Sequence, residues 1–218
     1  QILKMMENLH IINGLYAITP EQENLSILSS QVESCIKGGA KLIQYRSKQL
    51  SKIDQKKQAK EIKILCNTYN VPLIINDDIE LCRNLDADGV HLGEDDDSLL
   101  KARKLLGPSK IIGISCYNSI DRVKMAIDGG ANYVALGACF SSDTKKNAPQ
   151  VSMDLISLVL KEFKIPLVAI GGIDTENVEL LVKAGVKCVA LINGLFQAKD
   201  VEKTARIYTN ILKKNYER

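Results

Sequence analysis

Short apolar segments recur along the chain, at residues 11–18, 40–45, 71–76, 88–92, 110–115, 132–137, 166–171 and 187–192. From the second onward, each stops abruptly at charged, amide, hydroxyl or glycine residues. Nearly continuous apolar runs are typical of parallel strands that are buried on both faces. Strands that carry chemistry only at their C-terminal ends are typical of a β/α protein whose active site is built from βα loops.

Between these segments, apolar residues recur at helical spacing. After the second strand, Ala59, Ile62 and their neighbours lie on one helix face, and Ser51 with Asp54 forms a capping-box pattern ahead of them. We expect a helix after every strand, with the third and fourth helices short. A last helix is expected around residues 201–212.

A repeated glycine pattern supports a repeated β/α unit. Four segments share a helix end with glycine, two or three variable residues and then a strand. Glycine suits the left-handed position at which a helix ends and the chain turns into the sheet. We therefore expect a left-handed glycine in each segment, at 38–43, 88–92, 129–134 and 184–189.

Eight β/α units in 218 residues predict an α/β fold, namely a single (β/α)8 TIM barrel. We expect one domain over residues 1–218, with residues 1–10 as an N-terminal extension, because no linker or composition shift divides the chain. A doubly wound open sheet is the alternative. That fold would normally carry a glycine-rich turn after its first strand, where this chain has Thr19-Pro20-Glu21.

Composition narrows the class of partner. The chain is 45% hydrophobic and 25% charged, with a net charge of +3, so nothing indicates nucleic-acid or membrane binding. Six scattered cysteines without a CxxC pair predict free thiols in a reducing cytoplasm. The N-terminus shows no signal-peptide pattern and no stretch is apolar enough to span a membrane, which also favours a cytoplasmic protein. A homo-oligomer is compatible with the sequence, which leaves the oligomeric state open.

Cationic residues follow two of the strands. Arg46 and Lys48 come after the second strand, and Lys145 and Lys146 come after the sixth. Several cations that face one pocket suit a multiply charged phosphate. The alternative is solvated surface charge, but the expected position at the C-terminal barrel face favours a function for Arg46 and Lys48.

Carboxylates follow the third and fourth strands. Asp77 comes after the third, and the acidic run 94–97 comes after the fourth. Two carboxylates from adjacent strand ends can hold one Mg²⁺, which takes phosphate oxygens and waters as its other ligands. Alternatively, the acidic run caps a helix that starts near Ser98.

Glycine turns end the last two strands. Gly171-Gly172 and Asn193-Gly194 occupy the loops that often form the phosphate site of a barrel, although each alone is also compatible with a plain tight turn. His91 is interpreted as a structural histidine with its hydrogen bonds satisfied, and Cys116 as a packed thiol. No nucleophile–base order stands out.

In this order, these residues resemble the thiamine-phosphate synthase family over nearly the whole chain, from Leu15 to about Phe196. The matching motifs are Leu15-Tyr16-Ala17-Ile18-Thr19, Gln44-Tyr45-Arg46-Ser47-Lys48, Ile75-Asn76-Asp77, residues 89–96, Ser115, Ser142-Asp143-Thr144-Lys145 and residues 169–173. The resemblance implies condensation of 4-amino-2-methyl-5-pyrimidinylmethyl diphosphate with thiazole phosphate to give thiamine phosphate and pyrophosphate. It also implies that Mg²⁺ is required.

The resemblance further implies a role for each matching residue. Arg46, Lys48 and Lys145 act on the diphosphate as the catalytic cations, and Asp77 and Asp96 ligate Mg²⁺. Substrate contacts are implied for Gln44, Arg46, Lys48, Asn76, Ser115, Ser142, Thr144, Lys145, Gly172, Ile192 and Asn193. Three positions depart from the family pattern, since Ser142 replaces threonine, Glu94 replaces glutamine and Asn193 stands where serine is typical.

Three other functions are alternatives to the synthase reaction. The sister family of thiazole tautomerases shares the barrel and the glycine turn, but it does not need the paired carboxylates or the complete pyrimidine site. A regulatory module that binds a phosphorylated ligand would be favoured by loss of a metal ligand. Another sugar-phosphate barrel enzyme would leave the two carboxylates and the separate cations unexplained.

Overall fold

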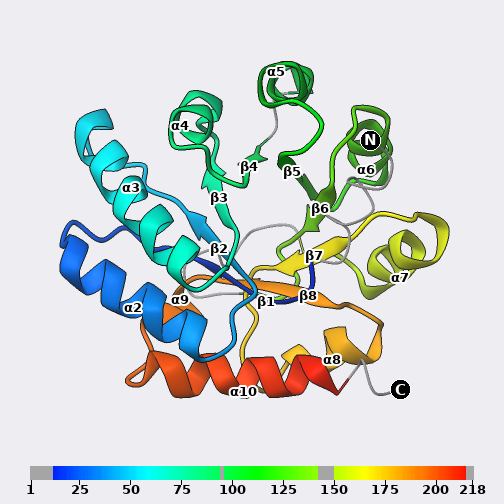
Figure 1. Cartoon of the computed structure of the whole chain (residues 1–218). Coiled ribbons are helices and arrows are strands. Elements are labelled where there is room, and N and C mark those ends of the chain that lie inside the picture. Colours follow the sequence, from blue (N-terminus) through cyan, green and yellow to red (C-terminus); the bar gives the residue numbers. More distant parts are fainter. Residues whose placement is uncertain (1–11, 94–95, 142–149, 215–218) are drawn as a thin grey trace.

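The computed structural model describes residues 12–93, 96–141 and 150–214, and for Asp96 and Asp97 it describes the backbone alone. Eight parallel strands close into a barrel in chain order (Figure 1). Their order confirms the TIM barrel and excludes the open sheet. The strands are β1 (Gly14–Ile18), β2 (Leu42–Tyr45), β3 (Leu73–Asn76), β4 (Gly89–Leu92), β5 (Ile111–Tyr117), β6 (Tyr133–Leu136), β7 (Leu167–Ile170) and β8 (Cys188–Leu191).

Helices surround the barrel, and Figure 1 shows them as an outer ring. They are α2 (Leu25–Lys37), α3 (Lys52–Thr68), α4 (Ile79–Asn84), α5 (Asp96–Leu106), α6 (Ile120–Asp128), α7 (Met153–Glu162), α8 (Val178–Lys183), α9 (Asn193–Phe196) and α10 (Val201–Lys213). The third helix after a strand, α4, is short as expected. The fourth, α5, has 11 residues, so the expectation of a short helix there is wrong.

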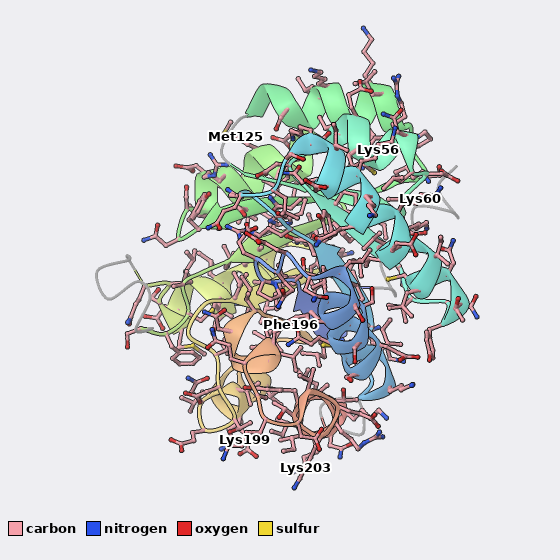
Figure 2. The ribbon with its side chains drawn as sticks, turned by 90° about the vertical axis from the view of Figure 1, so that its left-hand side faces the viewer. Lys56, Lys60, Met125, Phe196, Lys199 and Lys203 are labelled. Carbon is pink, nitrogen blue, oxygen red and sulfur yellow. The ribbon has the colours of Figure 1, made fainter. Side chains whose placement is uncertain are left out.

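Each strand buries both of its faces because it lies between two apolar layers. One layer fills the barrel, where Tyr16, Leu42, Ile74 and Tyr133 pack against each other. Residues one position away along each strand, such as Ile43, pack outward against the helices. The outer surface of the helices carries many charged side chains, and Figure 2 shows those of Lys60 and Lys203 there.

Local capping follows the sequence at most helix starts. Ser51 Oγ accepts a hydrogen bond from the Asp54 backbone N–H and donates to the Asp54 carboxylate, which confirms the expected N-cap. Asn24, Asp78, Ser119, Ser152 and Asp200 cap five other helices in the same way.

The expectation of a left-handed glycine in each of the four repeated segments is confirmed in three of them. Gly39, Gly130 and Gly185 have positive φ and follow helix ends as expected. In the second repeat the left-handed residue is Asp86, with φ of 48°, and Gly89 instead opens β4. A Cβ on Gly89 would lie 2.1 Å from the carbonyl oxygen of Ile111, so this glycine serves close strand packing.

Two further findings bear on the class of protein. All six cysteines are free and buried, as the scattered spacing predicts. Over the described ranges, the longest apolar helical stretches fall short of what a membrane span requires.

Candidate active site

Polar side chains form the last interior layer of the barrel, at the C-terminal ends of four consecutive strands. Gln44, Asn76, His91 and Ser115 come from β2, β3, β4 and β5. Gln44 and Asn76 continue inward-pointing rows that are apolar below them, with Leu42 below Gln44 and Ile74 below Asn76. Below His91 and Ser115 the rows continue with Gly89 and Gly113. Three of the four residues are expected substrate contacts, so the fold brings these three together.

The loop after β2 is fixed by residues from the loop after β1. Thr19 is fully buried, and its hydroxyl bonds both the N–H (2.8 Å) and the carbonyl (3.1 Å) of Arg46. The Glu21 carboxylate accepts from the Ser47 hydroxyl at 2.9 Å and from the Lys48 backbone N–H at 2.5 Å. These bonds hold the backbone of the two expected cationic residues.

The two cations differ in their surroundings. Lys48 Nζ lies 3.8 Å from Asp77 Oδ2, and both side chains are more than half exposed. At such exposure this ion pair contributes little to stability. Arg46 is partly exposed, and its guanidinium makes no ion pair within the described ranges.

Asp77 stands in an unusual backbone conformation just past β3, with φ of 61°. Its N–H donates to the carbonyl of His91 at 2.8 Å, and its Oδ2 accepts from the Asn76 amide at 2.8 Å. A Cβ added at Gly93 would lie 3.9 Å from Asp77 Oδ1, so the loop after β4 runs beside this carboxylate. Three residues further along that loop stands Asp96, the other expected Mg²⁺ ligand.

His91 has both ring nitrogens bonded, as the interpretation of a satisfied histidine anticipated. Nδ1 lies 2.9 Å from the Tyr133 hydroxyl and Nε2 lies 2.9 Å from Ser115 Oγ. The residue is partly buried, and burial lowers the pKa of His91 to about 4. The imidazole is therefore neutral at ordinary pH.

The loops after β7 and β8 adjoin each other. Gly171 and Gly172 have φ of 96° and 64°, and a Cβ on Gly194 would approach the carbonyl of Ile173 to 3.3 Å. The N–H groups of Gly172, Asn193 and Gly194 donate to no acceptor among the described residues. The remaining expected contacts here are Ile192, which follows β8 as the N-cap residue of α9, and Asn193, which begins α9.

Gly172 also has a packing role that the sequence does not reveal. A Cβ there would lie 2.3 Å from the carbonyl oxygen of Phe140, in the loop after β6. The Gly172 carbonyl accepts from the Asn177 amide at 2.9 Å, which fixes the turn from the other side.

Four expected site residues cannot be placed by their side chains. Ser142, Thr144 and Lys145 lie outside the described residues. Asp96 begins α5, but its side chain also lies outside the description. Among the described residues, no group of three or more His, Cys, Asp or Glu side chains could hold a metal ion.

Several residues at the site were not singled out from the sequence. Thr19 ends the first family motif but has no role implied there, and Glu21 enters only in the argument against a dinucleotide fold. Arg122, on α6, reaches the carbonyls of Ser115 (3.2 Å) and Gly93 (3.1 Å) and so ties together the loops after β4 and β5. No local signal marks these residues, because their partners are distant in the sequence.

Comparison with known proteins adds independent evidence. The family model described as thiamine monophosphate synthase matches residues 15–195. The chain belongs to the thiamine monophosphate synthase family. Membership of this family makes the chain an enzyme, a transferase of thiamine biosynthesis, and confirms the resemblance that the motifs indicated.

Two named relatives and one solved structure agree with the assignment to the thiamine monophosphate synthase family. A thiamine-phosphate synthase of Methylobacillus flagellatus is 47% identical over 195 residues, covering 89% of this chain and 93% of the relative. One of Nitrosospira multiformis is 44% identical, with 93% and 87% covered. The solved thiamine phosphate pyrophosphorylase from Pyrococcus furiosus superposes with a TM-score of 0.84 at 29% identity, covering 95% of this chain and 98% of that one.

Proposed function

We propose that this enzyme condenses 4-amino-2-methyl-5-pyrimidinylmethyl diphosphate with thiazole phosphate, releases pyrophosphate and requires Mg²⁺. The observation that carries the proposal is the polar interior layer of Gln44, Asn76, His91 and Ser115 beside Arg46, Lys48 and Asp77. A flat heterocycle and an anionic group need these two kinds of surroundings next to each other.

The amide and hydroxyl groups of the interior layer suit an aminopyrimidine ring. Gln44, Asn76 and Ser115 offer both donors and acceptors at the edge of an otherwise apolar barrel interior. A bound ring that satisfies these groups is favoured over an apolar ring of the same size, because the latter leaves buried polar groups unpaired.

The diphosphate would meet the cations after β2. Arg46 offers a planar fork, and Lys48 is already directed toward the Asp77 carboxylate. The Thr19 and Glu21 hydrogen bonds hold the backbone at both residues, so the cations are attached to a fixed loop. Lys145 is proposed as a third cation on the leaving group.

The residues near Asp77 are suited to Mg²⁺. This ion prefers a few carboxylate oxygens and completes its shell with water and phosphate oxygens. Asp77 is exposed, projects from a strand end and lies beside the loop that leads to Asp96. Asp77 and Asp96 would hold the ion, which supplies positive charge next to the departing diphosphate.

The chain itself need supply no nucleophile. An aminopyrimidine stabilises a benzylic-type cation when the C–O bond to diphosphate breaks, and the thiazole nitrogen then attacks that carbon. Arg46, Lys48 and Lys145 stabilise the negative charge that develops on the leaving oxygen. A reaction without a protein nucleophile is consistent with the state of the cysteines. Burial raises the pKa of the thiols of Cys139 and Cys188, which makes them poor nucleophiles.

The thiazole phosphate is assigned to the adjoining loops after β7 and β8. The N–H groups of Gly172, Asn193 and Gly194, which have no acceptor in the part of the chain that the structure describes, are suited to an anion. Ser142 and Thr144 are proposed to add their hydroxyls from the loop after β6. The six buried free thiols are in keeping with a reducing compartment such as the cytoplasm.

An assay with both synthetic substrates and Mg²⁺ tests the proposal. Thiamine phosphate should form only when both substrates and the metal are present, and one pyrophosphate should appear for each product. The same protein given a single thiazole isomer alone should leave it unchanged. Isomerisation without condensation would instead assign the chain to the tautomerase activity.

A further inference from the structure

Five polar side chains form a continuous hydrogen-bonded chain across the interior of the barrel. It begins at Gln44 Nε2, which donates to the Tyr16 hydroxyl at 2.9 Å. The Tyr16 and Tyr133 hydroxyls are 2.9 Å apart, and Tyr133 is 2.9 Å from His91 Nδ1. His91 Nε2 is 2.9 Å from Ser115 Oγ, which ends the chain at the C-terminal face.

With Gln44 donating through Nε2, the protons in the rest of this chain can be assigned in only one direction. Gln44 donates to Tyr16, so the buried Tyr16 proton has the Tyr133 oxygen as its acceptor. Tyr133, whose residue is 0% exposed, must then give its own proton to His91 Nδ1. A buried hydroxyl proton without an acceptor is costly, which excludes mixed arrangements.

We propose that this chain holds His91 as the Nε2–H tautomer, so that Ser115 accepts from His91 and directs its own hydroxyl proton to the substrate. Tyr16 is thereby a positioning residue, although it lies below the substrate layer. If the Gln44 amide were turned the other way, every bond would reverse and Ser115 would donate to His91 instead.

Packing keeps the chain in this arrangement. The Tyr133 ring lies flat against the His91 ring, with centroids 5.5 Å apart and planes at 22°, and edge-on to Tyr16 at 6.1 Å and 78°. A Cβ on Gly113 would lie 1.9 Å from the Tyr133 ring, so the absence of a side chain at Gly113 provides the space that the ring fills.

Ionised forms do not disturb this assignment. Burial raises the pKa values of Tyr16 and Tyr133 far above physiological pH. Both tyrosines are therefore neutral, and each hydroxyl has one proton to donate.

The inference deepens the proposed function, on which its substrate assignment depends. A Ser115 that donates is suited to a substrate atom with a lone pair and no proton, such as an unprotonated ring nitrogen of an aminopyrimidine. A Ser115 that accepted would instead select an N–H group. The direction of the chain thus decides which edge of the heterocycle faces β5.

The tautomer can be measured without substrate, which separates this inference from the proposed function. The chain has two histidines, so a His10→Gln variant leaves His91 as the only one. Nitrogen-15 NMR of the labelled variant should show a pyridine-like Nδ1 and a pyrrole-like Nε2. A pyrrole-like Nδ1 would overturn the inference, whatever reaction the enzyme catalyses.

Kinetics then test the positioning role. Tyr16→Phe should lower kcat/KM for the pyrimidine diphosphate roughly 3- to 10-fold, the value of one neutral hydrogen bond, and leave KM for the thiazole phosphate unchanged. Tyr45→Phe is the matched control, because it removes another buried hydroxyl, bonded to Gln58 outside the barrel interior. Equal losses in both variants, or equal effects on both substrates, would reject a positioning role for Tyr16.

Discussion

Glu21 binds the backbone of Lys48. Its Oε1 accepts the Lys48 N–H at 2.5 Å, and its other oxygen accepts from Ser47. The residues are separated by 27 positions and meet because β1 and β2 are neighbours in the barrel. The acidic side chain therefore orders a loop whose side chains are cationic.

The first prediction is that Glu21→Ala weakens binding of the pyrimidine diphosphate. Without the two hydrogen bonds, the loop loses its fixed backbone and the Michaelis constant for the diphosphate should rise on the order of tenfold. Glu23→Ala removes a nearby exposed carboxylate with no such contacts and is the control. A steady-state assay with varied diphosphate measures the difference, and equal constants for the two variants would contradict it.

The second prediction concerns the metal. Asp77→Asn should nearly abolish Mg²⁺-dependent turnover without unfolding the chain, because the Asp77 side chain is 53% exposed and asparagine tolerates the same left-handed backbone. Asp96→Ala should have the same effect, as should EDTA.

The adjacent carboxylate supplies the control for this metal test. Asp78 caps α4 and pairs with Lys52 at 3.0 Å, so Asp78→Asn keeps a capping side chain and should stay active. Magnesium titrations with thermal unfolding of each variant make the comparison. Full activity of Asp77→Asn, or of the wild type in EDTA, would reject the metal assignment.

The third prediction separates the roles of the cations. Lys145→Ala should mainly lower kcat, because charge on the leaving oxygen develops only as the C–O bond breaks. One such contact is worth on the order of 3 kcal/mol. Arg46→Ala and Lys48→Ala should also raise the Michaelis constant for the diphosphate, since both cations meet it before reaction. Weaker thiazole-phosphate binding with unchanged kcat in Lys145→Ala would remove its leaving-group role.

The fourth prediction distinguishes anion binding from backbone strain at Gly172. Gly172→Ala should raise the Michaelis constant for the thiazole phosphate far more than that for the diphosphate. Gly107→Ala has comparable strain, since its φ is 75°, but nothing lies within 4 Å of an added Cβ. Both variants should lose about 1 kcal/mol or more of stability in urea titrations. Gly172→Ala should lose more than Gly107→Ala, because its Cβ would also lie 2.3 Å from the Phe140 carbonyl oxygen, and only Gly172→Ala should lose thiazole-phosphate binding. Parallel kinetic losses would mean that strain alone explains the effect.

The sequence predicts the barrel well because its information is local. Apolar runs, helix caps such as Ser51 and most helix-ending glycines can be identified within a few residues of each other. Gly89 is the exception, since its need for space comes from Ile111 on the next strand. Such a contact cannot be found before strand register is known.

The site residues also differ in whether a local sequence signal predicts them. Gln44, Asn76 and Ser115 follow from strand ends and from the family motifs, and the fold gathers them into one layer. From the sequence, Tyr16 and Tyr133 are indistinguishable from ordinary core residues. Their hydroxyls are bonded in the barrel, but 117 positions separate the two residues, so no local signal indicates the bond. Glu21 and Arg122 were missed for the same reason.

The Gly113–Tyr133 contact also bears on how the barrel assembles. The two residues are direct neighbours across β5 and β6. A slip of two positions would preserve the inward and outward alternation, so hydrophobic patterning alone does not forbid it. It would, however, bring the Tyr133 ring against Ile111 or Ser115, and each of these residues carries a side chain where Gly113 has none. This pair of residues therefore sets the strand alignment on which closure of the eight-stranded ring depends.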